Sequence, residues 1–266
     1  MKDTYFCSMQ DFIEFKNNKV YYSSEGKGNV VLLLHGFLEN SSMWKELSEE
    51  LVKKHRVICV DLLGHGKTGC IGYVHTMEEM ADAVNEVLKS LQIGKATIIG
   101  HSMGGYVGLA FAEKYIEKVT GICLLNSTSQ ADSEERKELR LRACRMAQTN
   151  YEALVKMSIT NLFAETSRIT FAKEIEVIKK DALKTPVQGY IAATKGMRER
   201  KNRETVLKKI EKRLIISGEK DPILHKEFLV LEATRTKTPI TFLPLGHMSY
   251  IESNKDLTSK IKEFLN

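Results

Sequence analysis

Four short, continuously apolar segments separated by stretches long enough for a helix constrain the fold of this chain more than any other feature. They are rich in Val, Ile and Leu and comprise 30–34, 57–60, 96–99 and 119–125. Runs of this length and composition are typical of strands buried on both faces of a parallel sheet. The intervening segments 42–53 and 77–91 carry apolar residues at three- and four-residue spacing, as amphipathic helices do. The alternation predicts βαβ units.

Segments on either side extend the predicted sheet. Residues 12–15 and 20–22 flank a short polar turn and predict an antiparallel hairpin at one edge. The runs 214–217 and 239–243 restore the buried-strand pattern, and helical patterns follow each of them, over 225–235 and 254–265. Parallel strands need covered faces and right-handed crossovers, so we expect a three-layer α/β/α sandwich.

The middle of the chain has a different character. From 133 to about 203 it is charged and helix-patterned, with no buried strand. We interpret 127–203 as an inserted helical cap, and 1–126 together with 204–266 as the core. A chain of 266 residues, 42% of them hydrophobic, is long and apolar enough to form one core with one inserted cap.

The N-terminal segment and the cysteines indicate the cellular compartment and the redox state of the thiols. Residues 1–7 contain no apolar run of signal-peptide length, and no later stretch reaches a membrane-spanning length, so we expect a cytoplasmic protein without a membrane partner. The cysteines are odd in number, scattered and without Cys-x-x-Cys spacing. We interpret them as reduced thiols and propose neither a metal site nor a cofactor. They are Cys7, Cys59, Cys70, Cys123 and Cys144.

The net charge of +6 arises largely from a basic segment over 195–213. Basic runs serve nucleic-acid binding when aromatic residues that stack on bases are interleaved with them, and here they are not. We therefore expect a solvated helix face and no nucleic-acid partner. Attraction of an anionic substrate is the intermediate alternative.

The sequence Gly-His-Ser-Met-Gly-Gly over 100–105 lies directly between the run 96–99 and a helical pattern over 106–115. Taken alone, it also fits a glycine-rich helix start with an N-cap serine. Between a buried strand and a helix it is typical of a nucleophile on a sharp turn, where bulky neighbours would clash. We therefore expect Ser102 to project above the sheet at a helix N-terminus, which favours developing negative charge.

A serine hydroxyl needs a base, and the base needs a group that fixes its tautomer. Among seven histidines, His247 follows the last predicted strand, at the edge where loops gather above the nucleophile. Asp221 follows the strand 214–217 and is our candidate acid, although Asp-Pro is also a common turn. Glu219 is a weaker candidate, and the alternative position after 119–125 holds Asn126, which carries no charge.

Acyl transfer also needs donors for an oxyanion. The backbone N–H of Met103, the residue after the nucleophile, supplies one. The second is expected from His35-Gly36-Phe37, which closes the run 30–34, through the Phe37 N–H. A plain strand-ending turn is the alternative interpretation of that segment.

These segments, together with Asp61 to Gly66, resemble the α/β-hydrolase superfamily in their order and over nearly the whole chain. The resemblance implies an eight-stranded sheet with a helical lid, nucleophile Ser102, base His247, acid Asp221 and oxyanion donors Phe37 and Met103. Relatives that cleave carbon halides or epoxides use an aspartate nucleophile, so Ser102 argues against those activities. The chain departs from many relatives at Lys67-Thr68 and Lys212-Arg213, away from the three side chains.

Three functions remain open at this point. The first is hydrolysis of a small ester or related acyl substrate through an acyl-enzyme. The second is carbon–carbon bond hydrolysis or lysis of an anionic substrate, and the third is ligand binding by a receptor-like member of the fold. The cap shapes the cleft, and ordinary packing is the alternative role of its candidate lining residues, Met157, Phe163, Tyr190 and Met197. The sequence does not indicate an oligomeric state.

Overall fold

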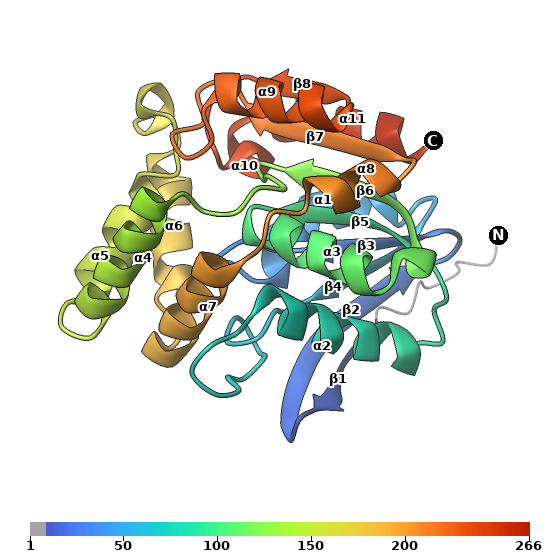
Figure 1. Ribbon diagram of the computed structural model, residues 1–266, viewed down its shortest axis with the longest axis horizontal. Coiled ribbons are helices and arrows are strands. Elements are labelled where there is room, and N and C mark those ends of the chain that lie inside the picture. Colours follow the sequence, from blue (N-terminus) through green and yellow to red (C-terminus); the bar gives the residue numbers. More distant parts are fainter. Residues whose placement is uncertain (1–8) are drawn as a thin grey trace.

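The computed structural model of this protein describes residues 9–266, which form one eight-stranded sheet flanked by helices (Figure 1). The strand order is β1-β2-β4-β3-β5-β6-β7-β8. The strands are β1 (Met9–Phe15), β2 (Asn18–Gly26), β3 (Val30–Leu34), β4 (Arg56–Val60), β5 (Ala96–His101), β6 (Val119–Leu125), β7 (Arg213–Gly218) and β8 (Ile240–Leu243).

Strand pairing gives a mostly parallel sheet. β1 pairs antiparallel with β2, and β2 pairs antiparallel with β4. All other neighbours, from β4 across to β8, are parallel. The predicted fold class is therefore confirmed, including the antiparallel edge. Because parallel strands run in one direction, the loops that follow β3, β5, β6, β7 and β8 all gather at one rim of the sheet.

Separate apolar cores cover the two faces of the sheet. The larger core packs under the helices α2 (Met77–Ser90), α3 (Met103–Lys114), α8 (Glu204–Lys209) and α9 (Lys226–Thr236). The second packs under α1 (Lys45–Leu51) and α11 (Asn254–Leu265), with Trp44 fully buried. These strands pack against an apolar core on both faces, which explains why the segments 30–34 and 96–99 do not alternate between apolar and polar residues. This arrangement holds the functional rim on a rigid support.

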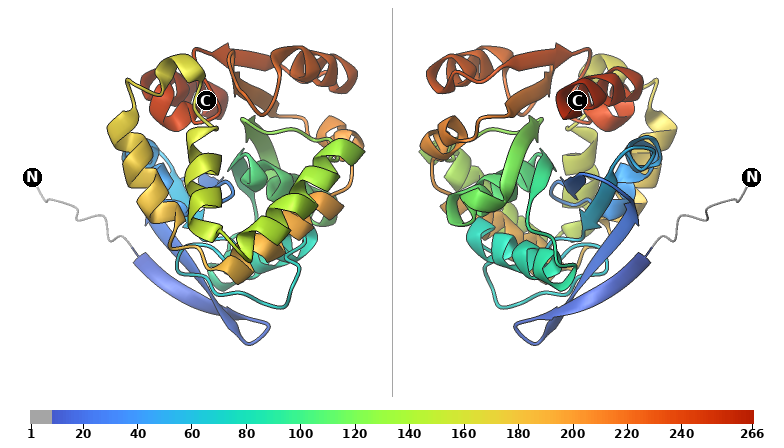
Figure 2. Two further views of the ribbon diagram at one scale, coloured as in Figure 1. Left: turned by 90° about the vertical axis from the view of Figure 1, so that its left-hand side faces the viewer. Right: turned by 90° about the vertical axis from the view of Figure 1, so that its right-hand side faces the viewer.

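Four of the five α-helices between β6 and β7 project from that rim and share an apolar cluster with Leu38 and Met248 (Figure 2). They are α4 (Glu134–Ala147), α5 (Tyr151–Thr160), α6 (Ala172–Ala182) and α7 (Val187–Glu199). A short helix, α10 (Ser249–Glu252), and 3-10 turns at Ser41–Trp44, Ile116–Lys118 and Glu165–Ser167 complete the fold. The division of the chain at 126 and 204 stays a prediction.

The basic segment 195–213 differs from the expected solvated face at two arginines, whereas Lys201, Lys208 and Lys209 are exposed as expected. Arg203 is 2% exposed and lies 2.5 Å from Glu78 and 3.0 Å from Glu113, which links it to α2 and α3. Arg200 is 6% exposed and lies 2.7 Å from Asp132. The apolar stems of these arginines are buried, and their guanidinium groups pair with acidic side chains of distant elements. Counting the charges within one segment of the sequence cannot show such partners.

In the described residues no helix is long and apolar enough to cross a membrane. Cys59, Cys123 and Cys144 are buried and Cys70 is half-buried, and each is a free thiol. Burial raises the pKa of Cys59 to about 11, so this thiol is a poor nucleophile. The segment 1–7 and Cys7 lie outside the described residues.

Candidate active site

The turn between β5 and α3 places Ser102 in a backbone conformation that few residues adopt. Its φ is 48° and its ψ is −113°. Two hydrogen bonds hold the turn: Ser102 N donates to Leu125 O at 2.9 Å, and Ser127 Oγ donates to Ser102 O at 2.7 Å. A strained backbone conformation that neighbouring residues hold in place by hydrogen bonds is typical of a functional site.

Glycines make this turn sterically possible. A Cβ on Gly100 would lie 2.4 Å from the carbonyl oxygen of Gly104, and a Cβ on Gly104 would lie 2.1 Å from that of Leu34. Both distances are far below van der Waals contact. The pattern of Gly-x-Ser-x-Gly is therefore required by close backbone approach at both ends of the turn.

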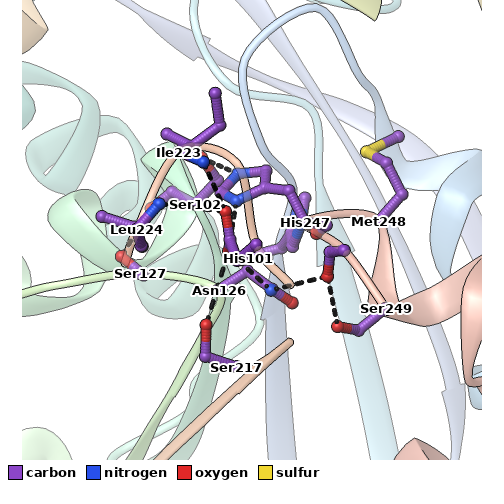
Figure 3. Close-up of polar contacts among 12 residues, drawn as sticks. His101, Ser102, Asn126, Ser127, Ser217, Ile223, Leu224, His247, Met248 and Ser249 are labelled. Carbon is purple, nitrogen blue, oxygen red and sulfur yellow. Dashed lines mark hydrogen bonds and ion pairs between the residues drawn. The ribbon is translucent and has the colours of Figure 1, made fainter. Parts of the chain in front are cut away.

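Ser102, His247 and Asp221 form a continuous chain of hydrogen bonds. Figure 3 labels two of the three, Ser102 and His247. His247 Nε2 lies 3.0 Å from Ser102 Oγ, and its Nδ1 lies 2.8 Å from Asp221 Oδ2. The three residues come from the loops after β5, β8 and β7, so the common direction of the parallel strands brings them together. The geometry fits a hydroxyl beside a base whose tautomer a carboxylate fixes.

Asp221 is held as a carboxylate by several donors. Burial raises its pKa, but the neighbouring His247, the Asn126 amide and the Leu224 N–H outweigh that effect, and the pKa lies below its usual value. Asn126 Nδ2 donates at 3.0 Å, and the backbone N–H groups of Ile223 and Leu224 donate at 2.8 Å and 3.0 Å. Glu219, the weaker candidate acid, instead pairs with Lys226 on the surface.

A buried ion pair lies behind the serine–histidine contact. His101 Nδ1 lies 2.8 Å from Glu39 Oε2, and His101 Nε2 lies 3.1 Å from the carbonyl oxygen of His247. Burial lowers the pKa of His101, but Glu39 outweighs it, so the net shift is upward and the pKa of Glu39 moves down. Glu39 also accepts from Gly36 N at 2.7 Å, which connects this pair to the loop after β3.

A second buried carboxylate ties the histidine loop to the helices above it. Glu252 accepts from Gly246 N at 3.1 Å and Met248 N at 3.2 Å on either side of His247. It also accepts from Ala164 N at 3.1 Å, and His247 N donates to Leu162 O at 3.0 Å. The position of His247 therefore depends on the segment between α5 and α6 as well as on the sheet.

Phe37 and Met103, the expected oxyanion donors, flank the nucleophile from two loops. Within the described chain, neither backbone N–H donates to a protein acceptor. Phe37 lines the same cavity as Ser102, and Met103 begins α3, where the first N–H groups have no partner inside the helix. A Cβ on Gly36 would lie 2.4 Å from Glu39 Oε2 and 2.7 Å from His101 Nδ1, so a side chain here would displace that pair.

Ser102 and His247 open onto a cavity of about 100 Å³. Of the four cap residues singled out from the sequence, Met197 lines it. Tyr190 is buried against Phe37, Phe163 is fully buried in the apolar cluster of α4 to α7, and Met157 is 51% exposed. The remaining lining residues are Phe37, Leu38, Glu39, His101, Tyr106, Arg136, Arg140, Ser158, Leu162 and Ile223.

Several of these residues could not be found from sequence patterns. Glu39, Asn126 and Glu252 belong to no motif, and their roles follow from contacts made over long sequence separations. His101 occupies the variable position of Gly-x-Ser-x-Gly, and only its contact with His247 shows its role. In the described residues no group of three or more His, Cys, Asp or Glu side chains has the geometry to hold a metal.

Comparison with known proteins agrees with this architecture. The family model described as alpha/beta hydrolase fold matches residues 29–254, so the chain belongs to that family. A solved thermophilic esterase from Thermogutta terrifontis, with malate bound, is 32% identical over 97% of this chain and 98% of its own, with a TM-score of 0.89. An enol-lactonase from Burkholderia xenovorans LB400 shares the fold, at 21% identity, 96% and 99% coverage and a TM-score of 0.88.

Curated relatives match over shorter parts. A 2-hydroxy-6-oxo-6-(2'-aminophenyl)hexa-2,4-dienoic acid hydrolase from Metapseudomonas resinovorans is 30% identical over 45% of this chain and 42% of its own length. The first curated relatives match over only 30% of their own length. The comparisons therefore establish the alpha/beta hydrolase family for this chain, and the activities of these relatives are their own.

Proposed function

We propose that this protein is a serine hydrolase that cleaves small esters through an acyl-enzyme formed on Ser102. The observation that carries the proposal is the unbroken hydrogen-bond chain from Ser102 Oγ through His247 to Asp221, at the wall of a small cavity. The near full-length likeness to a solved esterase supports an ester as the substrate. A cavity of about 100 Å³ favours a short acyl group.

The proposed reaction has two halves. His247 Nε2 takes the Ser102 proton while Oγ attacks the ester carbon, and the oxyanion accepts hydrogen bonds from the Phe37 and Met103 N–H groups. The tetrahedral intermediate collapses, His247 returns the proton to the departing alcohol, and the acyl group stays on Ser102. Water, deprotonated by His247, then attacks the acyl-enzyme to give a second tetrahedral intermediate. Its collapse breaks the bond to Ser102 Oγ, His247 returns the proton to that oxygen, and the acid leaves. Asp221 stabilises the imidazolium formed in each half.

Fluorophosphonate labelling with site mapping, combined with hydrolysis of p-nitrophenyl esters of increasing acyl length, tests the proposal. We expect labelling at Ser102 and turnover that is best for short chains. Ser102→Ala removes both, whereas Ser259→Ala, a change of the same kind on the exposed surface of α11, alters neither.

Two outcomes would contradict the proposal. Labelling at Ser102 without turnover of any ester would favour carbon–carbon hydrolysis or a ligand-binding role. Absence of labelling would show that Ser102 is not an activated nucleophile, and the catalytic assignment would be wrong.

A further inference from the structure

Three arginines surround one buried carboxylate, and two of them line the cavity onto which Ser102 opens. Asp132 is 6% exposed as a residue, and its carboxylate is fully buried. Arg140 Nε donates to Asp132 Oδ2, Arg200 Nη1 lies 2.7 Å from Oδ1, and Arg136 Nε lies 3.5 Å from Oδ1. Burial raises the pKa of Asp132, but Arg140 and Arg200 outweigh that effect and hold the carboxyl ionised.

The charges of this cluster do not balance. Within the described part of the chain, Asp132 is the one acidic side chain that pairs with Arg136, Arg140 or Arg200. A single carboxylate neutralises one guanidinium, so the cluster keeps two formal positive charges. Arg140, whose side chain is 15% exposed, is partly withdrawn from bulk water, and an anion that binds there compensates its charge.

The uncompensated arginines face the cavity of the proposed reaction. Arg136 and Arg140 line it together with Ser102 and His247. Their side chains are 38% and 15% exposed, and within the described residues their terminal Nη groups donate to no protein acceptor. The acidic group lining the cavity, Glu39, is already bound to His101 and Gly36. An anion entering the cavity therefore meets unused donors.

Arg200 has a different role from the other two. Its guanidinium stacks over the Tyr106 ring at 4.0 Å, and its Nε and Nη1 donate to the carbonyl oxygens of Gln130 and Met197, each at 3.0 Å. It is therefore fixed in place and holds Asp132, which in turn orients Arg140. A positioned guanidinium loses little freedom when it binds a ligand.

We propose that Arg136 and Arg140 form a carboxylate-binding subsite, and that the substrate is a short ester carrying a free carboxylate. The proposal rests on the function proposed above. A carboxylate matches the planar donor fork of arginine, and its size suits a cavity that also has to hold the ester group. The bound carboxylate orients the ester carbon toward Ser102 Oγ, so specificity arises from the charge rather than from chain length.

A matched pair of substrates tests the subsite. Monoethyl succinate and ethyl 4-methylpentanoate have the same shape, with a carboxylate in the first where the second has an isopropyl group. Acid release in a pH-stat gives kcat/KM for each. We expect wild-type protein to prefer monoethyl succinate by about 10-fold or more, as a charge-assisted contact provides.

Variants locate the contact. Arg140→Gln and Arg136→Gln should lower kcat/KM for monoethyl succinate by about 10- to 100-fold, while turnover of the neutral ester changes by less than about 3-fold. Arg142→Gln is the matched control, because Arg142 lies exposed on the same helix. Retained turnover of the neutral ester shows that each variant is folded. If Arg140→Gln unfolds, Arg136→Gln still tests the subsite, because the Arg136 side chain is half-exposed.

The outcomes separate the two proposals. If the neutral ester is hydrolysed as well as monoethyl succinate, or if both arginine variants lose the two substrates equally, the arginines serve structure alone and the subsite is refuted while the esterase proposal stands. If neither ester is hydrolysed and Ser102 is not labelled, the function itself is wrong, and the subsite as a substrate site is refuted with it.

Discussion

The Nε2 atom of His101 lies 3.1 Å from the carbonyl oxygen of His247, so the residue before the proposed nucleophile contacts the backbone of the proposed base. On its other side His101 pairs with Glu39, and Glu39 accepts from Gly36 N beside the expected oxyanion donor Phe37. One buried pair therefore connects the loops after β3, β5 and β8, which carry three separate parts of the proposed chemistry.

Glu39→Gln should reveal this positioning role. Glu39 outweighs burial and raises the pKa of His101, so wild-type protein holds a protonated His101 until the pH rises through that raised value. Without the carboxylate, burial keeps His101 neutral and its second N–H is lost. We expect kcat to fall by about 10-fold with little change in KM, because a misplaced base slows the chemical step.

The pH profile separates positioning from general destabilisation. Wild-type activity should fall on the alkaline side as His101 loses its proton, and the profile of Glu39→Gln should lack that decline. Glu227→Gln, an exposed change on α9, should leave kcat and the profile as in wild type. An unchanged alkaline decline in Glu39→Gln would mean that the pair has no role in orienting His247.

Asp221→Asn should remove most of the activity while leaving the fold intact. An amide keeps the shape of the side chain, but it no longer accepts from His247 Nδ1 as a carboxylate, so the imidazole is free to present the wrong tautomer to Ser102. We expect kcat to fall by roughly 10³- to 10⁴-fold. Stopped assays with p-nitrophenyl acetate measure the loss. Asp256→Asn, exposed on α11, is the control, and a loss below about 10-fold would remove Asp221 from the mechanism.

Sequence patterns predicted the sheet well because each strand carries its own signal. The runs 30–34 and 96–99 are apolar on both faces, and that composition reflects burial under helices on both sides. That Ser102, His247 and Asp221 lie together could be predicted for a related reason. Each follows a strand, and parallel strands deliver the residues that follow them to one rim.

Contacts between distant segments could not be predicted in this way. Arg200 belongs to a basic segment that resembles a solvated helix face, yet it is buried beside Asp132, 68 positions earlier in the chain. Met157 and Met197 both fit an amphipathic cap helix, but the structure exposes the first and places the second in the cavity. Helical spacing shows that a face is apolar and does not show what that face meets.

Gly100→Ala should destabilise the protein through the turn that carries Ser102. The added Cβ would lie 2.4 Å from the carbonyl oxygen of Gly104, and both groups belong to backbone that cannot move independently. We expect a loss of about 1–3 kcal/mol in the free energy of unfolding, as overpacking gives, together with weaker labelling of Ser102. Gly94→Ala is the control, since nothing lies within 4 Å of its added Cβ. Equal stability of the two variants, measured in urea, would show that the turn tolerates a side chain.

Protonation of buried histidines should weaken the fold in mild acid. Burial lowers the pKa of His65 to about 3, and it lowers the pKa values of His35 and His75 as well. His75 is 0% exposed, and its Nε2 accepts from Ile71 N. All three histidines are therefore neutral in the folded protein.

The sign of the effect follows from linkage. The unfolded chain takes up protons near pH 6.5, whereas folded His65 takes one up only near its lowered pKa, so stability is full above pH 6.5 and falls as the pH drops. Each such group contributes a slope of up to about 1.4 kcal/mol per pH unit. Urea unfolding of His65→Asn between pH 7.5 and 5.5 should give a shallower slope than wild type, whereas His225→Asn, an exposed change, should keep the wild-type slope. The slope of stability against pH is the readout, because the lost packing of the His65 ring lowers stability equally at every pH. An identical slope in His65→Asn and wild type would show that His65 is not neutral in the folded protein.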